Sequence, residues 1–195
     1  ALLGNAAFTD DVRSLVGKIA PYGACNSLAQ LAVKLASPGV PDTYQGCELW
    51  DLSLVDPDNR RPVDYERRRK LLGELSGAQG LVESFADGRI KLHVTRAGLQ
   101  MRAREKLLFL EGTYRPIAGG EHVIAFERAR GKTRLVCIVP CLPYKLTGGK
   151  RPWPLADAWG DATIEIGAGT WQNAFTGEGP EGNRLALRHV FATFP

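Results

Sequence analysis

Cysteine, histidine and long apolar stretches are all scarce in this sequence of 195 residues. No uninterrupted apolar run approaches the roughly 18 to 20 residues that a membrane-spanning helix needs, so we expect no membrane partner. The N-terminal segment contains Asp10 and Asp11, whereas a secretory signal is basic and then apolar. Together these features favour a cytoplasmic protein.

The cysteine content argues against both a disulfide framework and a metal site. Four cysteines are too few to staple a chain that is long enough to bury its own core. Cys137 and Cys141 are four positions apart, but Cys137 lies in an apolar β-type run and no Cys-x-x-Cys pair is present. We therefore expect reduced thiols and no metal. The cysteines and histidines of the sequence are Cys25, Cys47, Cys137, Cys141, His93, His122 and His189.

Positive charge is in slight excess, with 25 Lys+Arg against 21 Asp+Glu and a net charge of +4. The basic run over 67–70 and a second basic helical segment could line a nucleic-acid groove. However, Glu66 and Glu105 interleave with the basic residues, and no aromatic residue stands where a base could stack. We interpret both segments as solvated helix faces and expect no nucleic-acid partner. The second segment carries Arg96, Arg102, Arg104 and Lys106.

The first part of the sequence is predicted to be helical. An amphipathic pattern ends at Pro21 and Gly23, which are predicted to break it. Ser27 and Asp64 are positioned to cap the second and third helices, and Gly112 is positioned to end the fourth. The predicted helices span residues 8–20, 27–37, 64–75 and 89–110.

From about residue 113 the pattern changes to short β-type runs separated by turn residues. Helices followed by strands predict an α+β fold, whose second unit we expect to be an antiparallel β-sandwich of about six to eight short strands. Trp153, Trp159 and Trp171 are predicted to lie in its core; exposed and coplanar, they would instead form a glycan-binding face. The predicted strands lie at 122–127, 134–139, 163–166 and 185–194.

The segment over 38–64 is polar and rich in turns, and long ordered loops of this kind are usually functional. Its carboxylates, amides, guanidinium groups and aromatic rings are the groups that recognise sugar hydroxyls and sugar C–H surfaces. Two interpretations stay open at this point. Either the loop contacts a sugar, or Arg60 or Arg61 pairs with Asp56 or Asp58 only to hold the backbone.

Three strings in the sequence carry a resemblance to a known family. They are Asn26-Ser27-Leu28-Ala29-Gln30, Pro38-Gly39-Val40-Pro41-Asp42-x-Tyr44-Gln45-Gly46-x-Glu48 and Asp56-Pro57-Asp58-Asn59-Arg60-Arg61-Pro62-Val63-Asp64. The second is similar to a string found in many members of the α-amylase superfamily. The third points to one family within it, the maltooligosyl trehalose synthases, which the sequence closely resembles. Similar segments at Gly112-x-Tyr114, Ala125-Phe126-x-Arg128, Trp159-Gly160-Asp161 and 171–177 extend the resemblance over nearly the whole chain.

The resemblance implies an isomerase of glycoside hydrolase family 13. Such an enzyme converts the reducing-end α-1,4 bond of a maltooligosaccharide into an α,α-1,1 bond by retaining intramolecular transglucosylation, without a cofactor. Retaining chemistry requires two carboxyl groups about 5 Å apart. In the family these acids lie on barrel strands well before the part matched here. We therefore expect no catalytic residue in this chain, and no activity from the chain alone.

The resemblance also implies a domain organisation. A complete (β/α)₈ barrel takes roughly 250 residues, so we expect this chain, which begins with alanine, to be the C-terminal portion of a longer protein. Residues 1–75 would form the end of the catalytic barrel, with its last strand near 40–44. Residues 76–112 would form a helical connector, and residues 113–195 a C-terminal β-sandwich domain. The implied partners are the upstream barrel of the same protein and a maltooligosaccharide substrate.

Barrel-enzyme active sites lie at the C-terminal ends of the strands, so the resemblance places the loop over 38–64 beside the reducing-end glucosyl subsites. Two groups of residues follow from it. Those implied to position the substrate are Asp56, Asp58, Asn59, Arg60 and Arg61. Those implied to brace the loop are Tyr44, Glu48 and Asp64. The alternative is a non-catalytic carbohydrate-binding or interaction module that uses the tryptophans.

Overall fold

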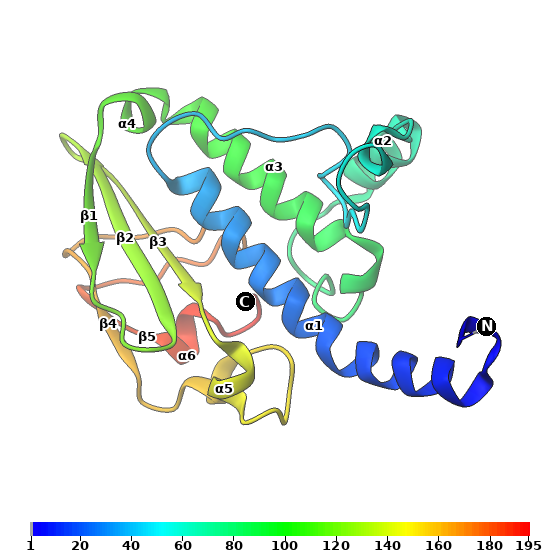
Figure 1. Cartoon of the computed structure of the whole chain (residues 1–195). Helices are drawn as coiled ribbons and strands as arrows, with labels where there is room; N and C mark the ends of the chain where they lie inside the picture. Colours follow the sequence, from blue (N-terminus) through cyan, green and yellow to red (C-terminus); the bar gives the residue numbers. More distant parts are fainter. Residues whose placement is uncertain (1) are drawn as a thin grey trace.

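Two long helices and two small antiparallel sheets make up the fold in the computed structural model, which describes residues 2–195 (Figure 1). Helices α1 (Ala6–Ala36) and α3 (Arg89–Arg104) lie side by side, and α1 also packs on the larger sheet. The strands are β1 (Thr113–Ile117), β2 (Val123–Arg130), β3 (Thr133–Pro140), β4 (Thr163–Glu165) and β5 (Arg184–Ala186). The shorter helices are α2 (Tyr65–Glu74), α4 (Lys106–Glu111), α5 (Pro143–Thr147) and α6 (Leu187–Val190). The 3₁₀ turns are η1 (Leu2–Gly4), η2 (Asp58–Arg60), η3 (Phe85–Asp87) and η4 (Ala156–Trp159).

Helix α1 is continuous, so the predicted break at Pro21 and Gly23 is wrong. It begins where the side chain of Asn5 accepts a hydrogen bond from the Phe8 N–H at 3.2 Å. Pro21 removes the usual donor to the carbonyl of Gly17, but the turn around Gly17 is exposed, so water can satisfy that carbonyl. Burial of the C-terminal half of α1 outweighs the local cost of proline.

The third predicted helix is confirmed and the fourth is interrupted. The side chain of Asp64 caps α2 by accepting a hydrogen bond from the Arg67 N–H at 2.8 Å. The predicted helix over 89–110 divides into α3 and α4 at Glu105, whose backbone has φ −103° and ψ 39°. Gly112 ends α4 as predicted, with its N–H donating to the carbonyl of Leu108 at 2.9 Å.

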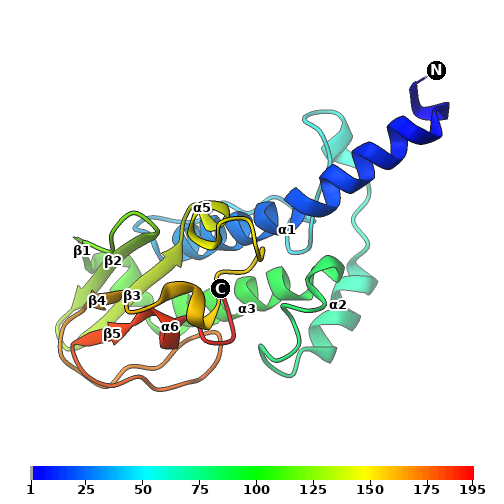
Figure 2. The same cartoon turned by 90° about the horizontal axis from the view of Figure 1, so that it is seen from below.

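The larger sheet has the order β1-β2-β3, and its two faces pack against different elements. Side chains alternate between faces along a strand. Phe126, opposite Cys137 in the register, packs with it against α1. Ala125, opposite Ile138, packs on the other face with residues of β4 and β5. Figure 2 shows the β4-β5 sheet beside the larger sheet. The sheet thus lies between α1 and the second sheet.

The α+β class is confirmed, but the predicted strands match only in part. Residues 2–195 contain five strands, fewer than expected. The run predicted over 185–194 is wrong beyond Ala186, because the chain turns into α6 and buries Leu187 and Phe191. Strand β1 was not among the predicted runs; it is mostly exposed and contains Pro116, which obscures its pattern.

The three tryptophans lie in or beside the core and do not form an exposed platform. Trp159 is buried, stacks on Phe191 at a centroid distance of 4.7 Å and donates from Nε1 to the carbonyl of Pro154 at 2.6 Å. Trp153 and Trp171 are partly buried against the two main clusters. Arg134 lies 4.9 Å from the Trp171 ring centroid. The core placement is therefore confirmed for Trp159 and holds in part for the other two.

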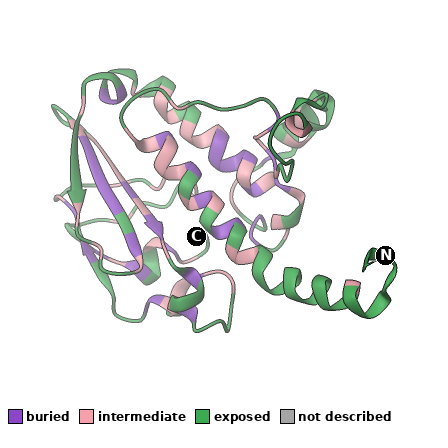
Figure 3. Cartoon of the chain, viewed as in Figure 1, coloured by how far each residue is buried: buried purple, intermediate pink, exposed green. Residues whose placement is uncertain are grey.

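Burial is uneven along α1 (Figure 3). Leu28, Leu31 and Leu35 are buried against α3 in the main helical core. The N-terminal half projects from the body with its apolar side chains exposed, among them Phe8 and Val12. Across residues 2–195, no helix combines the length and hydropathy required to cross a bilayer.

Candidate functional site

The loop between α1 and α2 is ordered without regular strand structure. Residues 40–44, where the sequence predicts a barrel strand, form no strand, and η2 is the loop's single helical turn among the described residues. A barrel strand needs hydrogen-bonded neighbours on both sides. None of the strands described here pairs with residues 40–44.

Basic side chains from three helices satisfy the backbone carbonyls of this loop. Arg102 of α3 donates to the carbonyls of Ser37, at 3.3 Å, and Gly39. Lys34 of α1 donates to the carbonyl of Asp42 at 2.9 Å. Farther along, Lys91 of α3 donates to Leu49 at 3.0 Å, and Arg68 of α2 donates to Gly46 at 2.6 Å. These lysine and arginine side chains take the place of the backbone N–H donors that a neighbouring strand would provide.

Arg68 and Arg102 correct the sequence-based interpretation of the basic segments. We predicted solvated helix faces, but the Arg68 side chain is only 18% exposed and Arg102 is half-buried. Their partners lie far away in the sequence, 22 residues for Arg68 with Gly46 and 63 for Arg102 with Gly39. The composition of a basic run carries no signal for partners at such separations.

Glu48, one of the residues implied to brace the loop, lies at a junction between the loop and α2. Its Oε2 accepts a hydrogen bond from Arg68 Nε at 2.9 Å. Asp64, at the other end of the loop, caps α2 with its side chain and accepts from Arg68 Nη1 with its carbonyl at 3.0 Å. Tyr44 has an exposed ring, and its carbonyl accepts from the Cys47 N–H at 3.2 Å.

The residues implied to position a substrate form one turn around the cis Asp56–Pro57 peptide bond, in which Asp58 and Asn59 are partly buried and the others are exposed. Arg60 donates to Asp56 at 2.6 Å, and Arg61 pairs with Asp58. Asp58 also accepts from the Leu54 N–H at 2.8 Å. The structure therefore brings both arginine–aspartate pairs together, as the backbone-holding interpretation requires. Both arginine side chains remain more than two-thirds exposed, at 68% and 74%, so they are also accessible from outside.

Asn59 differs from its neighbours in the turn. Its Oδ1 is buried and finds no hydrogen-bond partner among residues 2–195. A buried amide oxygen without a partner costs about 1–3 kcal/mol. The turn is thus not fully satisfied by the described chain.

Lys91 and Asp51 set the electrostatics at the base of the loop. Burial lowers the pKa of Lys91, against the opposing effect of nearby Cys47 and Asp51. Its Nζ lies 5.6 Å from the centroid of the Trp50 ring. Hydrogen bonds from the hydroxyl and N–H of Ser53, at 2.6 and 3.0 Å, lower the pKa of the Asp51 carboxyl. Neither Lys91 nor Asp51 is among the residues predicted from the sequence.

The loop is equipped for polar recognition. The carboxylates of Glu48, Asp56 and Asp58 are each engaged by an arginine. No group of three or more His, Cys, Asp and Glu side chains in residues 2–195 is arranged to hold a metal ion. Exposed guanidinium and carboxylate groups on one turn can hold several sugar hydroxyls.

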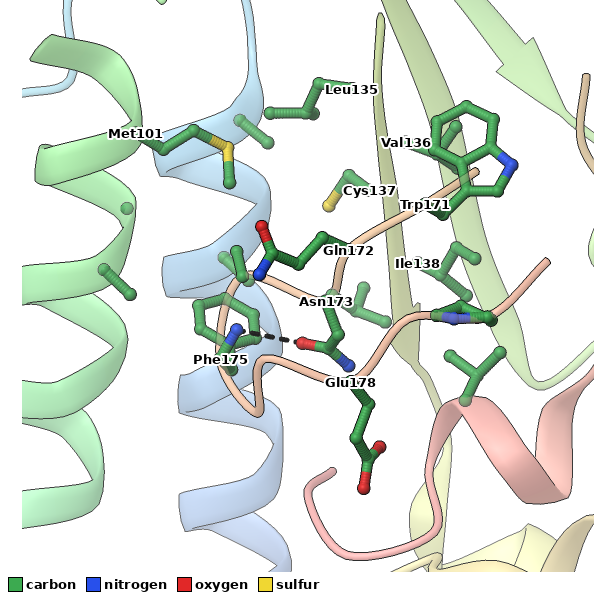
Figure 4. Close-up of a pocket in the computed structure, with 18 of the residues that line it drawn as sticks. Met101, Leu135, Val136, Cys137, Ile138, Trp171, Gln172, Asn173, Phe175 and Glu178 are labelled. Carbon is green, nitrogen blue, oxygen red and sulfur yellow. Dashed lines mark hydrogen bonds between the residues drawn. The ribbon is translucent and has the colours of Figure 1, made fainter. Parts of the chain in front are cut away.

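A separate cavity of about 840 Å³ lies between α1, α3, β3 and the segment over 171–181 (Figure 4). Met101 and Cys137 line it from α3 and β3, and Gln172 reaches into it from the segment. The Asn173 Oδ1 serves its own segment by accepting from the Phe175 N–H at 2.9 Å. None of the residues over 38–64 lines this cavity, so the cavity is separate from the candidate site on the loop.

Comparisons with known proteins agree with the resemblance identified in the sequence, although no family model matches the chain. The chain is 34% identical over 212 residues to a protein of Mycobacterium tuberculosis strain H37Rv that is assigned as a maltooligosyl trehalose synthase, covering 98% of this chain and 24% of that protein. It matches the solved structure of the Arthrobacter ramosus maltooligosyltrehalose synthase with a TM-score of 0.79 and 31% identity, over 96% of this chain and 23% of that one. The structure of a hypothetical maltooligosyl trehalose synthase of Sulfolobus tokodaii matches with a TM-score of 0.69 and 30% identity, over 100% of this chain and 23% of that one.

The resemblance to maltooligosyl trehalose synthase is therefore confirmed in both sequence and structure. The chain spans about a quarter of the length of the relatives that it matches.

Proposed function

We propose that this chain is the C-terminal portion of a cytoplasmic maltooligosyl trehalose synthase. The enzyme would be an isomerase of glycoside hydrolase family 13 that moves the reducing-end glucosyl unit of a maltooligosaccharide from an α-1,4 to an α,α-1,1 linkage in trehalose biosynthesis. The observation that supports this proposal is similarity along almost the full chain to one family, at 34% identity in sequence and a TM-score of 0.79 in structure.

In this proposal residues 1–75 complete the catalytic barrel and residues 113–195 form the C-terminal β-sandwich domain. Residues 76–112 form the helical connector between the two. In the full-length protein, residues 40–44, which pair with none of the strands described here, would find neighbouring strands in the rest of the barrel. The nucleophile and the acid/base carboxyl would lie on the upstream barrel strands. No cofactor is required by a retaining glycosyl transfer between two sugar hydroxyls.

The N-terminal half of α1 supplies the contact surface for that upstream barrel. Its apolar side chains are exposed in the described chain, and exposed apolar patches mark interaction sites. Leu52, Leu54 and Val55 of the loop are also more than three-quarters exposed, at 94%, 76% and 85%. Covering these residues with the barrel would bury an otherwise unfavourable apolar surface. The residues of α1 concerned are Phe8, Val12, Leu15, Val16 and Ile19.

The turn over 56–61 positions the sugar in this proposal. Arg60 pairs with Asp56 and Arg61 with Asp58. Each pair fixes the orientation of the guanidinium group, whose remaining N–H groups can donate to sugar hydroxyls. Such fixed donors would hold the detached glucosyl unit while it is reattached, and would limit its interception by water.

The test uses the full-length protein that contains this chain. Incubated with maltopentaose, it should convert reducing ends into a non-reducing product with little release of glucose. The 195-residue chain alone should give no turnover. Failure of the full-length protein to form a non-reducing product would contradict the proposed function, and formation of that product by the chain alone would contradict the placement of the catalytic acids upstream.

A further inference from the structure

We infer that Arg68 is a positioning residue of this reaction, an inference that rests on the proposed function. Its guanidinium group contacts both ends of the segment that contains the turn over 56–61. Nη2 donates to the carbonyl of Gly46 at 2.6 Å and Nε to Glu48 Oε2 at 2.9 Å. Nη1 donates to the carbonyl of Asp64 at 3.0 Å. A single side chain of α2 therefore joins residues 46–48 to residue 64.

The contact is closely packed on the loop side. Gly46 has a φ of +89°, which disfavours other residues. A Cβ at this position would lie 3.2 Å from Val63 Cγ2 and 3.4 Å from Arg68 Nη2. The absence of a side chain on Gly46 thus allows the guanidinium group to reach the backbone.

The turn itself has no comparable attachment to the rest of the molecule. Among the described residues, the hydrogen bonds of residues 54–62 all stay within that segment, and they include both arginine–aspartate pairs. On the N-terminal side, Leu49 and Trp50 are held by Lys91 and by the carbonyl of Phe85. The position of the turn relative to the body therefore depends on its anchored ends, and Arg68 is the side chain that contacts both.

Arg69, the next residue of α2, provides a matched control. It is also an arginine on the same helix, but its side chain is 71% exposed and pairs with Glu66 one turn earlier. It contacts no residue of the loop over 38–64 through a hydrogen bond in the described chain. Substitution of Arg69 by glutamine changes the charge of α2 by the same amount as Arg68→Gln, but it leaves the hydrogen bonds of Arg68 to the loop in place.

The experiment measures transfer and hydrolysis by the full-length protein with maltopentaose, as initial rates of non-reducing product and of released glucose. We expect Arg68→Gln to raise the ratio of hydrolysis to transfer by about 10-fold or more, because small displacements of positioning groups strongly reduce directed reactions. Arg68→Lys keeps a charge for Glu48 and loses the fork that reaches two carbonyls, so it should give a smaller rise. Arg69→Gln should leave the ratio within about twofold of the wild type, because its ion pair is exposed.

Thermal unfolding midpoints separate positioning from a general loss of structure. A raised ratio in a variant with an unchanged midpoint supports the inference. An unchanged ratio in folded Arg68→Gln overturns it, and so does an equal rise in Arg69→Gln. If Arg68→Gln does not fold, Arg68→Lys takes its place: a raised ratio of hydrolysis to transfer supports the inference, and an unchanged ratio overturns it. A wild-type protein that forms no non-reducing product rejects the proposed function itself and is recognised before any variant is compared.

Discussion

Gly98 of α3 lies directly against Leu35 of α1. A Cβ added at Gly98 would stand 2.6 Å from Leu35 Cδ1 and 3.1 Å from its Cβ. The two helices can approach this closely because one of them carries no side chain at the crossing point. Leu35 is 4% exposed, so it has little room to move away.

We expect Gly98→Val to destabilise the protein by about 1–3 kcal/mol, because overpacking forces the helices apart or Leu35 out of its rotamer. The measurement is the free energy of unfolding in urea. Gly73→Ala in α2 is the matched control, since a Cβ there meets no atom within 4 Å. It should be neutral or stabilise by about 0.5 kcal/mol through helix propensity. Equal losses in both variants would mean that the contact with Leu35 is unimportant.

Local patterns explain which parts of the fold could be predicted from the sequence. The Asp64 cap depends on an N–H three residues away, and the strands over 123–130 and 133–140 alternate clearly between two covered faces. The continuity of α1 through Pro21 was missed because it depends on packing of the distant C-terminal half. The Gly98–Leu35 contact was also missed, because a glycine in a helical pattern gives no sign of what approaches it.

The candidate site shows the same division. Pairing of arginines with aspartates in the turn over 56–61 was one of the two interpretations that the sequence left open, and those partners are three or four residues apart. The sequence gave no indication of Arg68, Lys91 and Arg102 as ligands of the loop backbone. Their backbone partners are separated from them by 22 to 63 residues, so only the folded chain brings them together. Sequence motifs can therefore locate the loop, but the residues that bind its backbone are identified only in the folded structure.

Arg128 of β2 is 1% exposed and donates only to backbone carbonyls in the described chain. It binds the ends of α1 and α4 and the start of β1. We expect Arg128→Met to cost at least about 3 kcal/mol, because several buried acceptors lose a charged donor at once. Arg130→Met, on the same strand, removes an exposed pair with Glu111 and should cost less than about 1 kcal/mol. Urea unfolding measures both, and similar losses would contradict this role of Arg128. The carbonyls that accept from Arg128 belong to Ala36, Leu108, Phe109, Gly112 and Thr113.

His93 of α3 is buried, and its Nε2–H donates to the carbonyl of Phe175 at 2.8 Å. Burial lowers its pKa below 6.5, with the hydrogen bond to Phe175 opposing and Arg96 adding to the effect. The unfolded chain then binds the proton more readily than the folded chain, so stability falls as the pH drops below 6.5 towards the lowered value. His93→Gln retains a donor and does not titrate. It should flatten the dependence of the unfolding free energy on pH below about 6.5. An unchanged slope in the variant would show that other groups cause the dependence.

Arg61→Ala tests the turn directly in the full-length protein. The side chain of Arg61 is 74% exposed although it pairs with Asp58, so it is available to a sugar. Its loss should raise the ratio of hydrolysis to transfer with maltopentaose by several-fold, because the detached glucosyl unit is held less firmly and water competes for it. Arg188→Ala removes another exposed pair, with Asp161, far from the loop in sequence. It should leave the ratio at the wild-type value, and an Arg61→Ala ratio equal to that of this control would assign Arg61 to holding the backbone alone.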